Sequence, residues 1–318
     1  MSNPIHSTSA KSVLPMLAMR GLATGLCAGC VVGLLRLSHD RAAARVALWL
    51  EEWREVWWTV PIWFGVLVAL AVILRRIVRE EPLISGSGIP QTELALAGRL
   101  SFTWWRVLLA KFLGSWLALF GGLALGREGP SIQMGGAVGA GFHALWRPAA
   151  PHALTGSPYV VAGAVAGLAA AFGAPAAGVL FAFEEMKSRR DTSLIVAACA
   201  SAIGAHLMIR IVFGMGRILP FAGFEAPPLS SFWIVALEGA VFGVLGVGYN
   251  KTLLWLHDRE AGQTLIPDRW RALPPLLLAG CLALFAPLLI GGGESLIIFV
   301  GEHDVALKTL ILLLAFKY

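Results

Sequence analysis

The sequence predicts an all-α, polytopic integral membrane protein with broken, tilted helices of uneven length. Hydrophobic residues make up 57% of the 318 residues, only 14% are charged, and the mean hydropathy is +0.74. A soluble chain of this size could not cover so much apolar surface with polar groups. Apolar runs near the length that crosses a bilayer, about 20 residues, recur along the chain. No soluble domain is visible, so we expect one transmembrane domain over residues 1–318.

The longer apolar runs predict the membrane-crossing helices. The first of them carries glycine at every fourth position, at Gly21, Gly25, Gly29 and Gly33, which predicts a face for close packing against another helix. Cys27 and Cys30 lie in the same run, and we interpret them as part of this packing rather than as a redox or metal site. The runs are Leu14–Leu37, Val60–Leu74, Trp105–Leu125, Ser193–Val212, Phe232–Leu256 and Leu273–Ile290.

The net charge of +6 is distributed at helix ends. Basic residues follow two apolar runs, and this positive-inside pattern predicts that both of these ends face the cytoplasm. A basic patch on a soluble face, as nucleic-acid binding requires, is missing from the sequence. We therefore expect a multi-pass protein of the plasma (inner) membrane that contacts the lipid bilayer and no nucleic acid. The basic residues concerned are Arg75, Arg76, Arg79, Lys187, Arg189 and Arg190.

Between the long runs lie shorter apolar pieces that glycine and proline interrupt. Broken helices occur at membrane depth only where the backbone lines a cavity or is buried in protein. In transporters the ends of such helices point at the substrate. The chain is therefore predicted to contain an internal pathway. The pieces are Gly88–Leu96, Pro130–Leu145, Val160–Phe172 and Pro175–Phe183.

The first interruption is SGSGIPQTE, Ser85–Glu93. Pro90 suits the first turn of a helix, where its missing N–H costs nothing. Free N–H groups and the positive end of the helix dipole would then point back towards Ser87, whose hydroxyl is a further donor. This arrangement is a half-shell for a desolvated anion. The alternative is an ordinary serine cap followed by a Gly-Pro turn.

The second interruption, LGREGPSIQMGGAVGA, places Arg127 and Glu128 within a long apolar stretch. Gly126, Gly129 and Pro130 again predict a helix start that attracts an anion. An ionised Glu128 would occupy the anion position itself, and a protonated Glu128 would swing aside, so one residue would serve as gate and proton carrier. We expect Arg127 to pair with a carboxylate, Glu93 being the candidate. The alternative is a buried pair that only holds two helices, although charges inside a membrane are functional by default.

The third segment is GVLFAFEEMKSRR, Gly178–Arg190. Glu184 and Glu185 close an apolar helix just before a basic loop. The negative end of the helix dipole and the neighbouring carboxylate both favour proton uptake by one of the two. The alternative is a solvated acidic pair that the following basic residues balance.

Together these segments resemble the CLC family of chloride channels and proton-coupled chloride antiporters. GSGIP (Gly86–Pro90) and GREGP (Gly126–Pro130) match two signature motifs of the family, and AGLAAAFGAPAAGVLFAFEEM (Ala166–Met186) matches the segment that follows. The resemblance covers essentially the whole chain, more weakly after about residue 215. It implies an inverted-repeat architecture, with a first repeat over about 14–215 and an incomplete second repeat over about 229–318, and a homodimer with one pathway per subunit.

The resemblance also implies roles for individual residues. Glu128 corresponds to the external gating glutamate and Glu185 to the internal proton glutamate, while Arg127 and Glu93 match the buried ion pair of the family. Serine at position 87 favours chloride over nitrate, and the GREGP form argues against the fluoride-selective branch. The implied chloride-binding residues are Ser87, Gly88, Ile89 and Gly129.

The sequence departs from the family in its second half. The G-x-F-x-P motif is missing, and none of Tyr159, Tyr249 and Tyr318 stands where the family has its chloride-coordinating tyrosine. If a second repeat begins near Leu229, the counterpart of Glu128 falls at about residue 343, beyond Tyr318. We therefore expect the chain to stop before the second anion-binding helix start.

The leading hypothesis is chloride/proton exchange, with chloride and protons as substrates and no cofactor or metal. A passive chloride channel and a truncated, non-transporting chain remain as alternatives. Glu185 argues against a channel, which needs no internal proton acceptor. An intramembrane serine protease is disfavoured because SGSGI departs from G-x-S-x-G and only His206 lies well inside a run. We therefore predict that the protein is not an enzyme.

Overall fold

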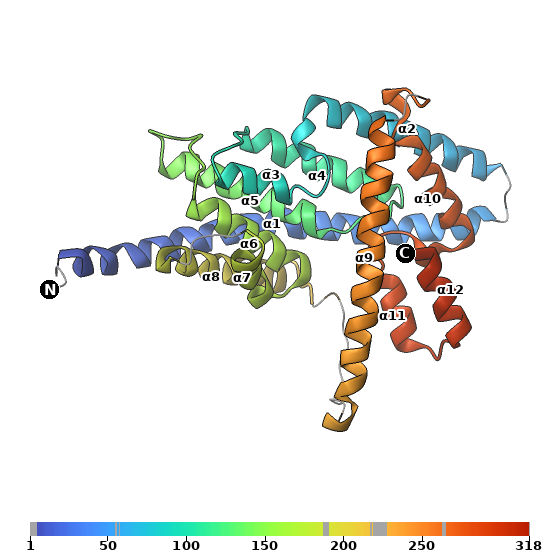
Figure 1. The fold of residues 1–318 in the computed structure, drawn as a ribbon. Helices are drawn as coiled ribbons and strands as arrows, with labels where there is room; N and C mark the ends of the chain where they lie inside the picture. Colours follow the sequence, from blue (N-terminus) through green and yellow to red (C-terminus); the bar gives the residue numbers. More distant parts are fainter. Residues whose placement is uncertain are drawn as a thin grey trace.

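The computed structural model describes residues 5–54, 56, 58–186, 191–216, 218, 228–262 and 265–317, and every regular element in these ranges is helical (Figure 1). Short 3-10 turns η1 (Pro82–Ile84), η3 (Leu229–Ser231), η4 (Asp268–Trp270) and η5 (Pro287–Leu289) and the π-helical turn η2 (Met208–Val212) lie between longer helices. The α-helices are α1 Ile5–Arg54, α2 Thr59–Glu80, α3 Ile89–Leu96, α4 Trp104–Phe120, α5 Glu128–Trp146, α6 Pro158–Phe172, α7 Pro175–Glu184, α8 Thr192–Leu207, α9 Phe232–Gly262, α10 Leu273–Phe285, α11 Glu294–Glu302 and α12 Leu307–Lys317.

The helices are of uneven length, as the sequence predicts. Within the described ranges, four segments are long and apolar enough to cross a membrane: Val13–Ala42, Thr59–Glu80, Thr192–Val212 and Leu229–Glu260. The expected run Trp105–Leu125 ends early, because Gly121 and Gly122 terminate α4 and Gly122 adopts a φ of 78°. The expected run Leu273–Ile290 is divided into α10 and η5 at Pro287, where proline cannot continue the helix.

The glycine face of α1 packs against α8, and this prediction is confirmed. A Cβ atom on Gly25 would lie 2.1 Å from the carbonyl oxygen of Ser201, and one on Gly21 would lie 2.5 Å from that of Ala197. Only glycine lets the two backbones come so close, which is how helices associate where the hydrophobic effect between them is weak.

The centre of the molecule is the crossing of α5 and α6. A Cβ atom on Gly135 would lie 2.1 Å from the carbonyl oxygen of Gly163, and one on Gly167 would lie 2.0 Å from that of Ser131. Helix α6 is surrounded by α1, α5, α7 and α8, and nearly all of its residues are buried. This close crossing sets the direction of α5 and therefore the position of its first residue, Glu128.

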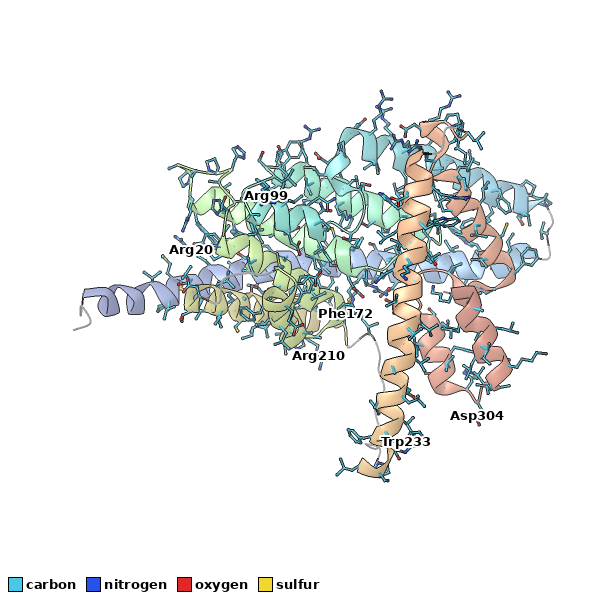
Figure 2. All side chains as sticks on the ribbon, viewed as in Figure 1. Arg20, Arg99, Phe172, Arg210, Trp233 and Asp304 are labelled. Carbon is cyan, nitrogen blue, oxygen red and sulfur yellow. The ribbon has the colours of Figure 1, made fainter. Side chains whose placement is uncertain are left out.

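The second half is more open. Helix α10 packs against α2, whereas no residue in the most apolar window of α9 is buried. Figure 2 shows side chains such as Trp233 extending from α9 into open space. The basic residues Lys187, Arg189 and Arg190, which the sequence assigns to a cytoplasmic loop, lie outside the described residues.

Candidate ion-transport site

Two helix starts meet at the centre of the candidate site. Helix α3 begins after Gly88, which has a φ of 91°, and Pro90 lies in its first turn. Helix α5 begins at Glu128. A Cβ atom on Gly129 would lie 2.6 Å from the carbonyl oxygen of Ser87 and 2.8 Å from its Cα atom. The fold therefore brings together Ser87 and Gly129, which are far apart in the sequence, and directs two sets of free N–H groups to one region.

Gln133 fixes the relative position of these two helix starts. Its side chain is 3% exposed, and its Nε2 atom donates a hydrogen bond to the carbonyl oxygen of Leu83 at 2.8 Å. A Cβ atom on Gly88 would lie 2.4 Å from Oε1 of Gln133. The sequence reasoning missed this residue, although a buried amide one turn after a charged helix start is an available signal.

The hydroxyl of Ser87 accepts a hydrogen bond from the N–H of Ile89 at 3.3 Å. This contact is local, like the one that the alternative interpretation of SGSGIP expects, although the residue at the N-cap position of α3 is Gly88 and not Ser87. Ser87 is nevertheless exposed, while Gly88 beside it is buried. The hydroxyl hydrogen therefore stays available for an anion on the open side, so a capping role and a binding role are compatible.

Glu128 is the first residue of α5 and is exposed, so its carboxylate lies where the helix dipole favours negative charge. Arg127 forms ion pairs with Glu294, with 2.9 Å between Nη2 and Oε1, and with Asp40, with 3.5 Å between Nη1 and Oδ1. These two acidic partners come from α1 and α11, and the pairing of Arg127 with Glu93 stays a prediction. Glu93 is a cavity-lining residue of α3, whereas Glu294 opens α11 beside the segment that carries Arg127.

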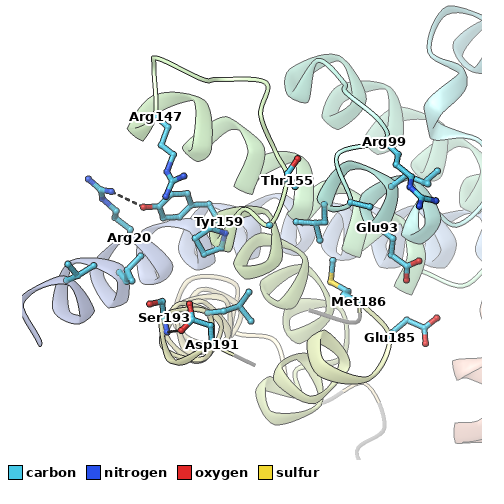
Figure 3. A pocket seen from close by; sticks show the side chains of 18 of the residues that line it. Arg20, Glu93, Arg99, Arg147, Thr155, Tyr159, Glu185, Met186, Asp191 and Ser193 are labelled. Atoms are coloured by element: carbon cyan, nitrogen blue, oxygen red, sulfur yellow. Dashed lines mark hydrogen bonds between the residues drawn. The ribbon is translucent and has the colours of Figure 1, made fainter. Parts of the chain in front are cut away.

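A cavity of about 1170 Å³ lies between α1, α3, α6 and the α7–α8 connection. Glu93 and Glu185 belong to its wall, and Figure 3 shows both side chains among the residues that line it. On the other side of the cavity, Arg20 donates a hydrogen bond to the hydroxyl of Tyr159 at 2.8 Å. Glu185 lies one residue beyond the end of α7. The cavity lining includes Glu185 and not Glu184, so the two adjacent glutamates have different surroundings.

Comparison with known proteins places this arrangement in a family. The family model described as "Voltage gated chloride channel" matches residues 64–318. The chain belongs to this family. It is 36% identical over 299 residues to the H(+)/Cl(-) exchange transporter ClcA of Vibrio cholerae, and 35% identical over 286 residues to ClcA of Cronobacter sakazakii. These alignments cover 91% and 85% of this chain but 64% and 60% of the relatives, so the chain spans less than two thirds of their length.

Solved CLC structures share the fold. The crystal structure of a slow cyanobacterial Cl⁻/H⁺ antiporter superposes with a TM-score of 0.82 and 28% identity, covering 93% of this chain and 71% of the antiporter. A CLC-type fluoride/proton antiporter superposes with a TM-score of 0.71 and 20% identity, covering 100% and 76% of the two chains. The predicted CLC fold is therefore confirmed, and the chain is an integral membrane protein.

The turns that precede α3 and α11, one in each half of the chain, are held by lysine side chains in the same way. Lys111, on α4, donates hydrogen bonds to the carbonyl oxygens of Ile84 and Gly86 at 2.8 and 2.7 Å. Lys317, on α12, donates to those of Leu289 and Gly291 at 2.9 and 2.7 Å. The segments PLISGSG and PLLIGGG, which precede α3 and α11, carry the matching sequence signal. The sequence reasoning did not use this signal.

Proposed function

We propose that this chain forms the ion pathway of a CLC-type chloride/proton exchanger. Chloride passes the starts of α3 and α5, protons enter at Glu185, and both meet at Glu128. The observation that carries this proposal is the contact of Gly129 with Ser87, because it directs two helix N-termini to one point without an intervening side chain.

Chloride is held by donors at these two helix starts. The backbone N–H groups around Gly88, Ile89 and Gly129 and the hydroxyl of Ser87 are the proposed ligands. Free N–H groups and the positive dipole end stabilise an anion that has left its water shell. The carboxylate of Glu128 competes for the same position when it is ionised. Protonation removes its charge, so Glu128 then releases the position to chloride.

Protons use a separate entrance. Glu185 lines the cavity that Glu93 also lines, so water in this space can deliver a proton to either carboxylate. Exchange follows if the proton then reaches Glu128, because release of Glu128 from the anion position is tied to its protonation. Glu184, outside the cavity lining, has no part in this route. This transport role, rather than an enzymatic one, is also what the names of the ClcA relatives support.

The surroundings of the pathway follow from the same family membership. We propose a homodimer in the plasma (inner) membrane, with one pathway per subunit. We further propose that residues of about 14–215 and 229–318 are structural repeats of opposite orientation. The parallel between the Lys111 and Lys317 hydrogen bonds supports this repeat.

The experiment is paired measurement of chloride and proton flux in vesicles that contain the full-length protein. The unaltered protein should move protons against chloride. Glu128→Gln should pass chloride without moving protons, because the amide neither carries a proton nor competes as an anion. Proton coupling that survives in Glu128→Gln would contradict the role of Glu128. Chloride flux without protons in the unaltered protein would indicate a passive channel instead.

A further inference from the structure

The segment that leads to the gate is held by the second half of the chain. Gly121 and Gly122 follow α4, and the N–H of Gly291 donates a hydrogen bond to the carbonyl oxygen of Gly122 at 3.4 Å. Ile290, directly after η5, lies beside the same glycine, because a Cβ atom on Gly122 would be 3.8 Å from the Cβ atom of Ile290. The position of Glu128 at the end of this segment therefore depends on elements that come more than 150 residues later in the sequence.

Arg127 provides the strongest of these connections. Its guanidinium reaches Oε1 of Glu294 at 2.9 Å, and its side chain is only 12% exposed. The Glu294 side chain is 28% exposed, whereas Asp40, the other partner, is 52% exposed and lies 3.5 Å away. The shorter and better shielded pair is the stronger one, since solvent weakens an ion pair. Because Arg127 directly precedes Glu128, any movement of Arg127 reaches the gate.

Glu294 is itself held in place at the start of α11. It is the first residue of that helix and follows Gly293, which has a φ of 97°. Lys317 fixes the turn before it through the carbonyl oxygens of Leu289 and Gly291. The carboxylate folds back over Gly292, where a Cβ atom would lie 2.9 Å from Oε2 of Glu294. Its location is therefore set by backbone geometry as well as by the ion pair.

The remaining charged groups around this pair come from α1 and α12. Arg36 is buried and donates a hydrogen bond to the carbonyl oxygen of Ala170 at 2.8 Å. Arg36 and His39 both interact electrostatically with Arg127, Asp40 and Glu294, and Lys317 interacts with Glu294. The cluster thus contains two arginines and two carboxylates. Lys317 and His39 also interact with members of this cluster. Removing one carboxylate leaves excess positive charge beside Glu128.

We propose that Glu294 is a positioning residue for the gate: through Arg127 it holds the start of α5 and sets the electrostatic field in which Glu128 gains and loses its proton. This proposal rests on the proposed function of Glu128. The sequence signal for it is an acidic residue directly after the second Gly-rich turn, GGGE, where the first turn has an isoleucine.

The expected effect of Glu294→Gln has a definite sign. The substitution removes negative charge near Glu128, and the excess positive charge favours its ionised form. More acid is then needed to protonate the gate, so the midpoint of acid-activated chloride flux moves to lower pH. The direction of the shift follows from the sign of the charge that is removed. Asp40→Asn acts in the same direction by a smaller amount, because Asp40 is more exposed and farther from Arg127.

The test is the pH dependence of chloride flux between about pH 4 and pH 8, measured in vesicles with the full-length protein. Glu294→Gln should lower the midpoint, and Glu294→Asp should restore it in part. Glu302→Gln, at the other end of α11, is the matched control and should leave the midpoint unchanged. In a Glu128→Gln background, Glu294→Gln should no longer change the pH dependence of chloride flux. If Glu294 had only a structural role, the substitution would lower chloride flux in that background as well.

Two outcomes separate this inference from the proposed function. If the unaltered protein shows no proton-coupled flux, the proposed exchange is wrong. If it does, and Glu294→Gln keeps the midpoint of the unaltered protein, the positioning role is wrong. Should Glu294→Gln not yield folded protein, Glu294→Asp provides the comparison, because its carboxylate is shorter and should hold Arg127 less well. An unshifted midpoint in folded Glu294→Asp would then overturn the proposal.

Discussion

Replacing Gly129 by alanine probes the contact on which the anion site depends. The new methyl group would lie 2.6 Å from the carbonyl oxygen of Ser87 and 2.8 Å from its Cα and Cβ atoms. Ordinary contacts of a methyl carbon begin near 3.4 Å, so the starts of α3 and α5 must separate by roughly 0.8 Å to relieve the shortest contact. Most of the opposing atoms are backbone, which cannot rotate away as a side chain can.

The separation has two expected costs. Overpacking of this kind lowers the free energy of unfolding by about 1–3 kcal/mol. An anion bridged by donors from both helices also loses one charge-assisted hydrogen bond, worth about 1.5–3 kcal/mol. Chloride affinity should then fall by roughly tenfold to a hundredfold.

The assay is chloride binding by calorimetry, with flux from vesicles as the functional measurement. Gly126→Ala is the matched control, because a Cβ atom there meets nothing within 4 Å although the residue belongs to the same motif. Gly126→Ala should bind chloride as the unaltered protein does. Equal chloride affinities for Gly129→Ala and Gly126→Ala, both in folded protein, would refute the idea that the two helix starts share one anion.

Three further predictions concern selectivity, proton entry and stability. Ser87→Pro should reduce the preference for chloride over nitrate, because the hydroxyl donor is lost while the helix start survives; unchanged flux ratios would leave Ser87 a cap only. Glu185→Val should abolish proton movement and keep chloride flux, while Glu184→Val should reduce proton movement much less. Equal effects of the two variants in paired flux assays would make the pair a generic acidic cluster. Gly25→Ala should lower the free energy of unfolding of the purified protein by about 1–3 kcal/mol, because the new methyl group would lie 2.1 Å from the backbone of α8. Gly65→Ala is the control, with nothing within 4 Å, and a similar loss there would contradict the packing argument.

Much of the first half was predictable because its signals are local. The four-residue glycine spacing predicts the face of α1 that meets α8, and Gly86–Pro90 and Gly126–Pro130 predict two helix starts without any tertiary information. Their meeting at Ser87 and Gly129 was implied by family resemblance rather than by spacing. The close approach of Gly129 to Ser87 and the hydrogen bond from Gln133 to Leu83 bring the two starts together, and both depend on tertiary packing.

The partner of Arg127 was not predictable from local signals. Glu93 was the obvious candidate because it lies in the neighbouring motif, whereas Arg127 also forms ion pairs with Asp40, inside α1, and with Glu294, the first residue of α11. An ion pair depends on the direction of the side chain and on which distant element packs next to it. The spacing of residues along the sequence specifies neither. Gln133 was missed for a related reason. Its importance comes from a hydrogen bond that joins α5 to the carbonyl oxygen of Leu83 in η1, fifty residues earlier in the sequence.

The central claim is that one anion binds where the starts of α3 and α5 meet and that Glu128 competes for that position. Crystals of the full-length protein soaked in bromide, with anomalous diffraction recorded for the unaltered protein and for Glu128→Gln, test it most directly. We expect a bromide peak within hydrogen-bonding distance of Ser87 and the N–H groups of Ile89 and Gly129. We also expect that Glu128→Gln gains bromide at the position that the carboxylate otherwise occupies. Bromide bound elsewhere in a transport-competent protein, with none beside Ser87 in either form, would contradict the account.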